Sequence, residues 1–479
     1  MSTHCGYVVN IKELRPHSNA DKLQIATFFG NDTCVGLDVK LDDIGIYFPS
    51  DLQLSVEFCE QHNLVRRKDD SGNNVGGYLD PDKRNIRTIK LRGEKSDGLF
   101  MPLQCLAYTG INLDDLNIGD RIDIVNGHEI CKKYIPHSNR RRGSYSEGNK
   151  TRKKKIPIAP LFAEHTDTEQ LAYNLNAFKA GDQIEITLKM HGTSHRVGYL
   201  ETLQGYKRTF ADKIFRREGT PEYNWGYVAG TRRTILEDYN GGYYGSNEFR
   251  EAHTKFFNGK LWKGETVYME IVGFTNDGTP IMSNCENKKL NDKDFIKQYG
   301  DTTVFSYGCD PTGYTELPMK NTELPYGAVV TVPKSEIYVY RMTMTNEDGN
   351  IVEYTPDFMR YRCEQMGVKT VPVLWKGFIP YTIDDVESAI SGHRIILKEG
   401  ESAGEWIKNV AEQYYDGPDP VGKTHIREGV VVRIINRPKF CAYKHKNFSF
   451  KCLEGIVKAE AESPDIEEAQ EIEVEEGEE

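Results

Sequence analysis

The sequence contains no apolar run long enough to cross a membrane, and its first residues lack the charged and apolar pattern of a secretory signal peptide. Its ten cysteines are scattered, without a Cys-x-x-Cys pair or a Cys/His cluster at zinc-binding spacing. A helical membrane protein and a zinc module are therefore excluded. We expect reduced thiols in a cytoplasmic protein without a membrane partner, located in the host cytoplasm if the chain is viral.

Basic residues are absent from 459–479, a segment that carries eleven Asp and Glu residues. The formal net charge of −11 therefore resides in this tail, and the rest of the chain is neutral. We expect the tail, residues 456–479, to be disordered. Overall acidity does not exclude a nucleic-acid partner, because binding depends on a local basic surface.

The length of 479 residues is sufficient for two or three domains. Residues 1 to about 130 show short alternating apolar runs, as at 23–28 and 44–48, separated by Asn, Asp, Gly and Pro. This pattern predicts a small antiparallel barrel within a first domain of residues 1–135. The alternative is a turn-rich β domain without a particular function.

A strongly basic run follows the first domain. Residues 139–155 carry eight Lys and Arg residues and a single Glu. A solvated linker explains such a run, and so does a segment that contacts phosphates with salt-dependent affinity. We assign residues 136–160 as a basic linker.

Residues 185–194 predict a short strand that delivers Lys189 to a polar turn at Gly192. A lysine amine is a poor nucleophile while protonated, with an ordinary pKa of about 10.4. Desolvation and neighbouring cations or a metal lower that pKa and free the lone pair for covalent chemistry. Taken alone, however, a lysine at a strand end is more often a solvated edge residue.

Two later strands each carry a single carboxylate. Glu270 lies within the apolar run 266–273, and Glu428 directly precedes the β-branched run 429–434. Glu270 could face solvent, but a buried glutamate there requires a cation or hydrogen-bond donors. Near the C-terminal end, alternation places Lys444 and Lys446 on one face of a strand.

This set of residues matches the needs of nucleotidyl transfer. A lysine attacks an α-phosphate and forms a covalent lysyl–nucleotide, while Mg²⁺ held by carboxylates neutralises the phosphates. Additional lysines stabilise the phosphate oxyanions and lower the pKa of the nucleophile. An aromatic ring stacks on the base.

The order of the motifs resembles that of ATP-dependent RNA ligases in the covalent nucleotidyltransferase superfamily, and most of all the fifth RNA-ligase family. The run His17-Ser18-Asn19-Ala20-Asp21-Lys22-Leu23 also resembles a signature of tRNA-binding OB modules. The resemblance covers most of residues 5–455. It implies an α+β, β-rich fold in which an OB-like barrel precedes an ATP-grasp-like nucleotidyltransferase domain, residues 161–455, of antiparallel sheets with flanking helices.

The resemblance also implies roles for single residues. Lys189 corresponds to the nucleophile, and Glu270 and Glu428 correspond to the metal-organising carboxylates. The implied catalytic residues are Lys189, Glu270, Glu428, Lys444 and Lys446. The implied ATP-binding residues are Leu188, His191, Gly192, Arg232, Tyr340 and Arg433.

Two of these positions leave alternatives open. Tyr340 is the expected ring that stacks on adenine, but Tyr338 or Phe305 could serve instead. His191 stands where the wider superfamily has Asp two residues after the lysine, which favours the RNA-ligase branch. A neutral imidazole cannot neutralise Mg²⁺ as a carboxylate does.

The implied activity is the sealing of 3′-OH and 5′-phosphate ends, as in RNA repair, through a lysyl-AMP intermediate and an adenylylated 5′ end. The implied cofactors are ATP and Mg²⁺ or Mn²⁺. The implied substrate is a nicked RNA or RNA/DNA duplex with RNA on the 3′-OH side, bound by a monomer. The alternatives are a DNA ligase, an RNA-capping guanylyltransferase, and a non-catalytic RNA-binding protein built on a ligase scaffold.

Overall fold

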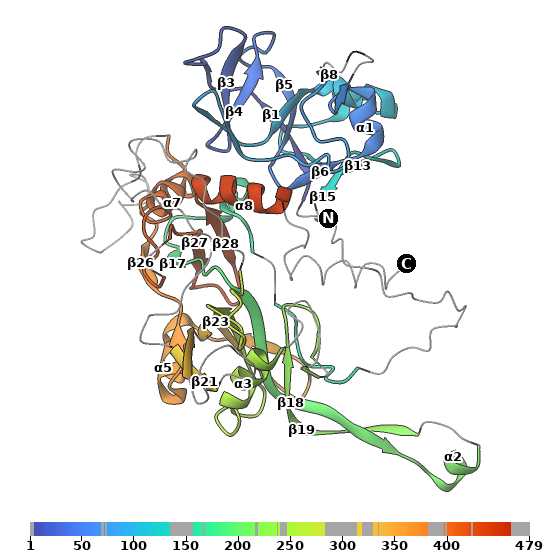
Figure 1. The fold of residues 1–479 in the computed structure, drawn as a ribbon, viewed down its shortest axis with the longest axis vertical. Helices are drawn as coiled ribbons and strands as arrows, with labels where there is room; N and C mark the ends of the chain where they lie inside the picture. Colours follow the sequence, from blue (N-terminus) through green and yellow to red (C-terminus); the bar gives the residue numbers. More distant parts are fainter. Residues whose placement is uncertain are drawn as a thin grey trace. The chain divides into compact units, whose positions relative to one another are not determined.

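The computed structural model describes residues 4–68, 71, 74–134, 157–165, 168–215, 219–236, 238–239, 247–282, 314–318, 329–333, 335–381, 397, 400–422 and 425–460. The predicted α+β, strand-rich class with antiparallel sheets is confirmed (Figure 1). The chain divides into two compact units. The first contains the described residues up to 134 together with the last helix, and the second contains those from 157 to 447.

The first unit consists of short antiparallel strands. One sheet has the order β11 (Leu99–Pro102), β5 (Ile44–Phe48), β1 (Gly6–Asn10) and β12 (Arg121–Ile122), and another has β2 (Leu14–Pro16), β3 (Leu23–Phe28) and β4 (Asn31–Gly36). The other strands pair in twos: β6 (Leu52–Leu54) with β15 (Cys131–Lys133), β7 (Arg66–Lys68) with β8 (Asn74–Gly76), β9 (Ile89–Leu91) with β10 (Glu94–Ser96), and β13 (Ile124–Val125) with β14 (His128–Glu129). These described strands form separate hydrogen-bonded sheets, and no closed barrel of the kind that we expected is found among them.

Helices complete the first unit. Helix α1 (Val56–Gln61) begins at Ser55, whose side chain accepts the backbone N–H of Phe58. Two 3₁₀ helices follow at Leu103–Thr109 and Leu113–Asp115. Helix α8 (Phe448–Glu460) is grouped with this unit, and its Lys451 Nζ lies 2.5 Å from the buried carboxylate of Asp97. The predicted second domain, residues 161–455, includes the first part of this helix.

Two large sheets make up most of the described part of the second unit. The first has the order β16 (Glu169–Gln170), β28 (Ala442–Lys446), β27 (Gly429–Ile434), β17 (Gln183–Leu188) and β26 (Val373–Phe378). The second has β19 (Thr220–Gly230), β18 (Thr193–Lys207), β20 (Glu265–Val272), β23 (Glu336–Thr345) and β24 (Ile351–Glu353), with β25 (Lys369–Thr370) also paired to β23. The chain passes from one sheet to the other between β17 and β18, and Lys189 lies in this connection.

Helices flank both sheets. They are α2 (Phe210–Ile214), α3 (Glu248–Phe256), α5 (Pro356–Met366), α7 (Ala403–Glu412) and the 3₁₀ helices Leu171–Tyr173 and Leu175–Ala177, and a separate strand pair joins β21 (Tyr314–Pro318) to β22 (Val329–Pro333). The sequence also predicts helices near 355–366 and 402–414, and the structure confirms them as α5 and α7, which Thr355 and Ser402 cap as local sequence favours. A further helix that the sequence predicts near 382–391 and a strand that it predicts at 302–309, which includes Phe305, lie outside the described residues.

A small apolar cluster joins the two sheets. Leu188 of β17 and Met190 pack with Val272 of β20 and Tyr338 of β23. Burial of these side chains holds the edges of the sheets together at the point where the chain crosses between them. Within the described residues, no helix combines the length and the apolar character that a membrane crossing requires.

Candidate active site

Lys189 is placed by the pairing of β17 with β27. Its backbone N–H donates to the carbonyl of Gly429 at 3.0 Å, which extends the ladder beyond Leu188. Gly429 has a φ of +151°, and a Cβ at this position would lie 2.1 Å from the carbonyl oxygen of His445. Only glycine allows this approach of β28. The next residue toward the N-terminus is Glu428, and Lys189 Nζ lies 2.5 Å from its Oε1.

Glu428 is the centre of a buried polar cluster. Its carboxylate also lies 3.4 Å from Lys446 Nζ and 3.2 Å from His191 Nδ1. Burial by itself raises the pKa of Glu428, but Lys189, Lys446 and His191 outweigh it and bring the pKa well below its usual value. The carboxylate is therefore charged, and it contacts two lysines and a histidine that come from two segments of the chain, 189–191 and β28.

The two lysines of β28 are positioned by strand alternation. Lys446 pairs with Gly429 of β27, and Lys444 pairs with Val431 of the same strand. The two side chains therefore lie on the same face of the sheet. Lys446 contacts Glu428, and Lys444 occupies the neighbouring position of the same face.

Glu270 comes to the site from the second sheet. It pairs with Ser194 on β18 and with Tyr338 on β23. A Cβ on Gly192 would lie 2.2 Å from the carbonyl oxygen of Ile271 and 3.0 Å from Cγ of Glu270. The turn after Lys189 therefore needs glycine in order to pass directly beside Glu270.

Tyr340 and Arg232 meet around a histidine that the sequence did not single out. The hydroxyls of Tyr340 and Ser194 are 3.3 Å apart, and the ring of Tyr340 lies 5.0 Å from that of His165. His165 donates its backbone N–H to the carbonyl of Arg232. Tyr338, the alternative ring, is buried against Leu188, whereas Tyr340 is half-buried. Tyr340 is the better placed of the two for stacking.

Leu188 and Arg433 lie apart from the polar cluster. Leu188 belongs to the apolar cluster beneath it. Arg433 pairs with Glu185 at the other end of β27, donates to the carbonyl of Tyr354 at 3.2 Å and lies over the ring of Phe440. Burial lowers the pKa of Arg433, although Glu353 and Glu185 oppose this effect.

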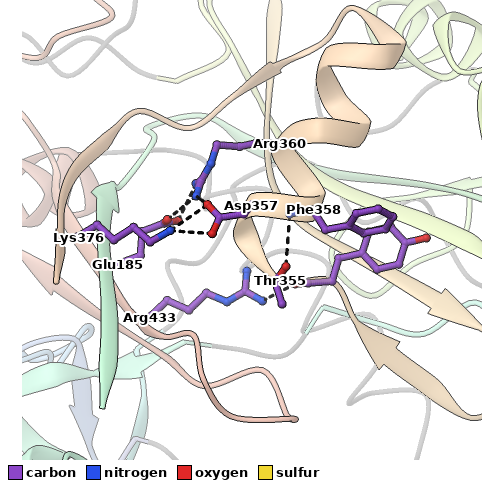
Figure 2. A network of polar contacts seen from close by, with 8 residues as sticks. Glu185, Thr355, Asp357, Phe358, Arg360, Lys376 and Arg433 are labelled. Atoms are coloured by element: carbon purple, nitrogen blue, oxygen red, sulfur yellow. Dashed lines mark hydrogen bonds and ion pairs between the residues drawn. The ribbon is translucent and has the colours of Figure 1, made fainter. Parts of the chain in front are cut away.

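Arg433 thus lies beside a polar network that joins the first sheet to α5 (Figure 2). Arg360 of α5 donates to both carboxylate oxygens of Glu185, at 3.0 and 2.8 Å, and also to Asp357. Lys376 of β26 donates to both oxygens of Asp357. The network fixes α5, whose N-cap residue is Thr355, against β17, the strand that ends just before Lys189.

Arg250 is a second residue near the site that sequence reasoning missed. It lies on α3, is almost fully buried, and donates to the carbonyl of Ser194 at 2.7 Å and to Thr193 Oγ1 at 2.6 Å. It therefore holds the start of β18 just after the turn at Gly192. The only sequence signal for Arg250 is that an arginine lies on the apolar face of an amphipathic helix. His165 lies in no periodic pattern, so the sequence offers no signal for it.

The donor set fits a nucleotide with its metal. Lys189, Lys444 and Lys446 could supply cations for phosphate oxygens, and Glu270 and Glu428 could supply the oxygen ligands that Mg²⁺ and Mn²⁺ accept. No three His, Cys, Asp or Glu side chains among the described residues gather closely enough to hold an ion by themselves. A metal here would need phosphate oxygens and water as further ligands, which is the usual mode for Mg²⁺ at a nucleotide.

Neither a family model nor a curated protein sequence matches the chain. Solved structures of Naegleria gruberi RNA ligase do match. A mutant with AMP and Mn aligns with a TM-score of 0.51 and 15% identity over 94% of this chain and 98% of that chain. A second mutant, with ATP and Mn, aligns with a TM-score of 0.50, the same identity and the same coverage. The chain has the RNA-ligase fold.

Proposed function

We propose that the protein is an ATP-dependent RNA ligase of the fifth RNA-ligase family that joins 3′-OH and 5′-phosphate ends. It would act through a covalent Lys189–AMP intermediate and an adenylylated 5′ end. One observation carries the proposal. Lys189 Nζ lies 2.5 Å from a buried carboxylate that also contacts Lys446 and His191, in a chain with the RNA-ligase fold.

The covalent step requires a neutral amine. Nζ of Lys189 forms the bond to the α-phosphorus, the bond to the pyrophosphate oxygen breaks, and the amine proton is released. To reach the phosphorus, Lys189 must leave its ion pair with Glu428. Lys446, which is 3.4 Å from the same carboxylate oxygen, is placed to take over that contact. A divalent ion, when bound, supplies further positive charge against the phosphates.

The remaining residues have supporting roles in the proposal. Lys444 and Lys446 stabilise the α-phosphate oxyanions, and Glu270 organises the metal together with Glu428. Tyr340 stacks on adenine, while Arg232 and the backbone at Gly192 contact the nucleotide. Leu188 supports the adenine site from the apolar cluster, and Arg433 acts through the network in Figure 2.

ATP and Mg²⁺ or Mn²⁺ are the proposed cofactors. The Naegleria gruberi ligase structures contain ATP or AMP together with Mn, which supports this choice. The proposed substrate is a nicked duplex with RNA on the 3′-OH side. The first unit and the basic run at 139–155, which lies outside the described residues, would bind it in the cytoplasm.

Labelled ATP tests the proposal directly. The wild-type protein should retain label on the chain after denaturation, and Lys189→Ala should retain none. Lys255→Ala is the matched control, because Lys255 is an exposed lysine of the same unit and should leave labelling unchanged. Labelling by GTP alone would favour a capping enzyme, and absence of any adduct would favour a non-catalytic RNA-binding protein.

A second assay separates RNA ligase from DNA ligase. Nicked duplexes that differ only in the sugar at the 3′-OH end should be sealed when that end is RNA. Equal sealing of an all-DNA nick would contradict the proposed specificity.

A further inference from the structure

The second sheet carries a ribbon that extends beyond its neighbours. Strand β18 pairs with β20 only from Thr193 to Gly198, but it pairs with β19 as far as Lys207. Residues 199–207 and 220–227 therefore form a two-stranded arm with α2 at its tip, which Figure 1 shows projecting from the second sheet. At about 3.3 Å per residue, the tip lies roughly 45 Å along β18 from the turn after Lys189.

The tip exposes large apolar side chains to solvent. Phe210 is 79% exposed, Phe215 68% and Ile214 59%. Exposed apolar side chains grouped at one place mark interaction surfaces more often than isolated ones do. The neighbouring Lys207 and Arg208 are also exposed. The tip therefore presents aromatic rings and cations side by side.

Aromatic side chains continue along one face of the arm. Tyr199 stacks on Tyr227 with ring centroids 4.7 Å apart, and Trp225 lies 5.9 Å from Tyr199. The next cross-strand pair on this face is Leu203 with Tyr223. Lys263 Nζ lies 5.1 Å from the Trp225 ring, so a cation accompanies the rings here as well.

The opposite face of the arm is covered by the chain itself near its base. Leu200 and Val228 pack there against Phe162, and the backbone N–H of Leu203 donates to the carbonyl of Ile158. Tyr199 and Tyr227 also pack against the core of the second sheet, so among the described residues of the arm the tip is the most exposed part and the most accessible to a partner.

The charge of the tip selects the class of partner. In the sequence, residues 207–217 contain five Lys and Arg residues and a single Asp. Two such tips repel each other, which disfavours a second copy of the arm as its occupant. A polyanion with flat apolar faces satisfies both the cations and the rings, and a nucleic-acid strand with unpaired bases is such a partner.

We propose that the β18–β19 arm binds the RNA substrate at a distance from the ligation site. The cations of Lys207 and Arg208 contact phosphates, and Phe210 and Phe215 stack on unpaired bases. This inference rests on the proposed RNA substrate. It assigns the arm no part in the chemistry at Lys189, so the formation of the lysyl-AMP adduct does not depend on the arm.

Two arm variants of the full chain test the proposal by fluorescence anisotropy with labelled RNA over a salt series. Lys207→Gln/Arg208→Gln should weaken binding about tenfold at low salt. It should also reduce the slope of log affinity against log salt by roughly 1.4, at about 0.7 per phosphate contact on a single strand. Phe210→Ser/Phe215→Ser should weaken binding at least about fivefold and leave the slope unchanged.

The controls separate the arm from the active site. Lys255→Gln/Lys369→Gln removes two exposed lysines elsewhere in the same unit and should bind RNA as the wild type does. Both arm variants should form the lysyl-AMP adduct at the wild-type rate, and both should lose affinity only for RNA long enough to reach the tip.

Other results would overturn the arm proposal or the proposed ligase activity. Wild-type RNA affinity and salt slope in both arm variants would remove RNA from the arm. A change from oligomer to monomer in the arm variants, measured by sedimentation, would make the arm a contact between copies. Arm-dependent RNA binding in a wild-type protein that forms no adduct would refute the proposed ligase activity and leave the arm proposal standing.

Discussion

Lys189 Nζ lies 2.5 Å from Glu428 Oε1, although the two residues are far apart in the sequence. Lys189 directly follows β17 and Glu428 directly precedes β27, and these two strands are paired. The Glu428 side chain is only 5% exposed and its carboxylate also contacts Lys446 and His191. The nucleophile proposed for this protein is therefore held by a carboxylate that also contacts a second lysine, which could take its place.

Glu428→Gln should slow adduct formation about 10²–10³-fold, because the amide cannot neutralise Lys189 and Lys446 or hold a metal. Single-turnover labelling with ATP measures the rate. Glu251→Gln, which removes an exposed carboxylate of α3, is the control and should react normally. A Glu428→Gln enzyme with the wild-type rate would remove this residue from the mechanism.

Arg250→Met should slow adduct formation at least about tenfold. The variant leaves the carbonyl of Ser194 without its donor and loosens the start of β18, and small displacements at a reacting centre are costly. Arg250→Lys replaces the planar guanidinium, which donates to two acceptors, with a single ammonium group and should recover only part of the rate. If Arg250→Met lowers the melting temperature but leaves kcat and KM for ATP unchanged, the residue is structural only.

The network in Figure 2 predicts an asymmetry between two variants. Arg360→Met leaves the Glu185 carboxylate, which is 3% exposed, without its bidentate partner and should cost about 3–5 kcal/mol of unfolding free energy. Glu185→Gln should cost less, about 1–3 kcal/mol, because Arg360 keeps its contact with Asp357. Urea unfolding of both single variants and the double variant measures the coupling. Equal costs, or simple additivity, would contradict a shared network.

Asp97 predicts a pH dependence of the first unit. Burial raises the pKa of Asp97, but Lys451 and Thr88 outweigh it, and the pKa falls below its ordinary 3.8. The charged pair therefore contributes stability that is present above pH 3.8 and is lost as the pH falls through the lower pKa of the folded state. Asp97→Asn should be less stable than wild type near neutral pH by about 3 kcal/mol, and the difference should shrink in acid. A difference that stays constant in acid would assign the effect to packing.

Local pattern was sufficient to predict the parts of the site. The alternation of 185–188 and the turn at Gly192 predicted the strand end at Lys189, and both appear in the structure. Period-two spacing placed Lys444 and Lys446 on one face of β28. These predictions depend only on neighbours in the sequence, because side-chain direction in a strand alternates with each residue.

Only the tertiary structure decided which of these parts meet. The register of β17 against β27 brings Glu428 to Lys189 but carries Arg433 to Glu185, and no local pattern encodes a register between distant strands. Arg250 and His165 could be recognised as site residues only in the structure, because their contact partners lie far away in the sequence. The sequence by itself determined which face of each strand carries a charge. The pairing of strands, which depends on how the whole chain buries its apolar surface, determined what each charge contacts.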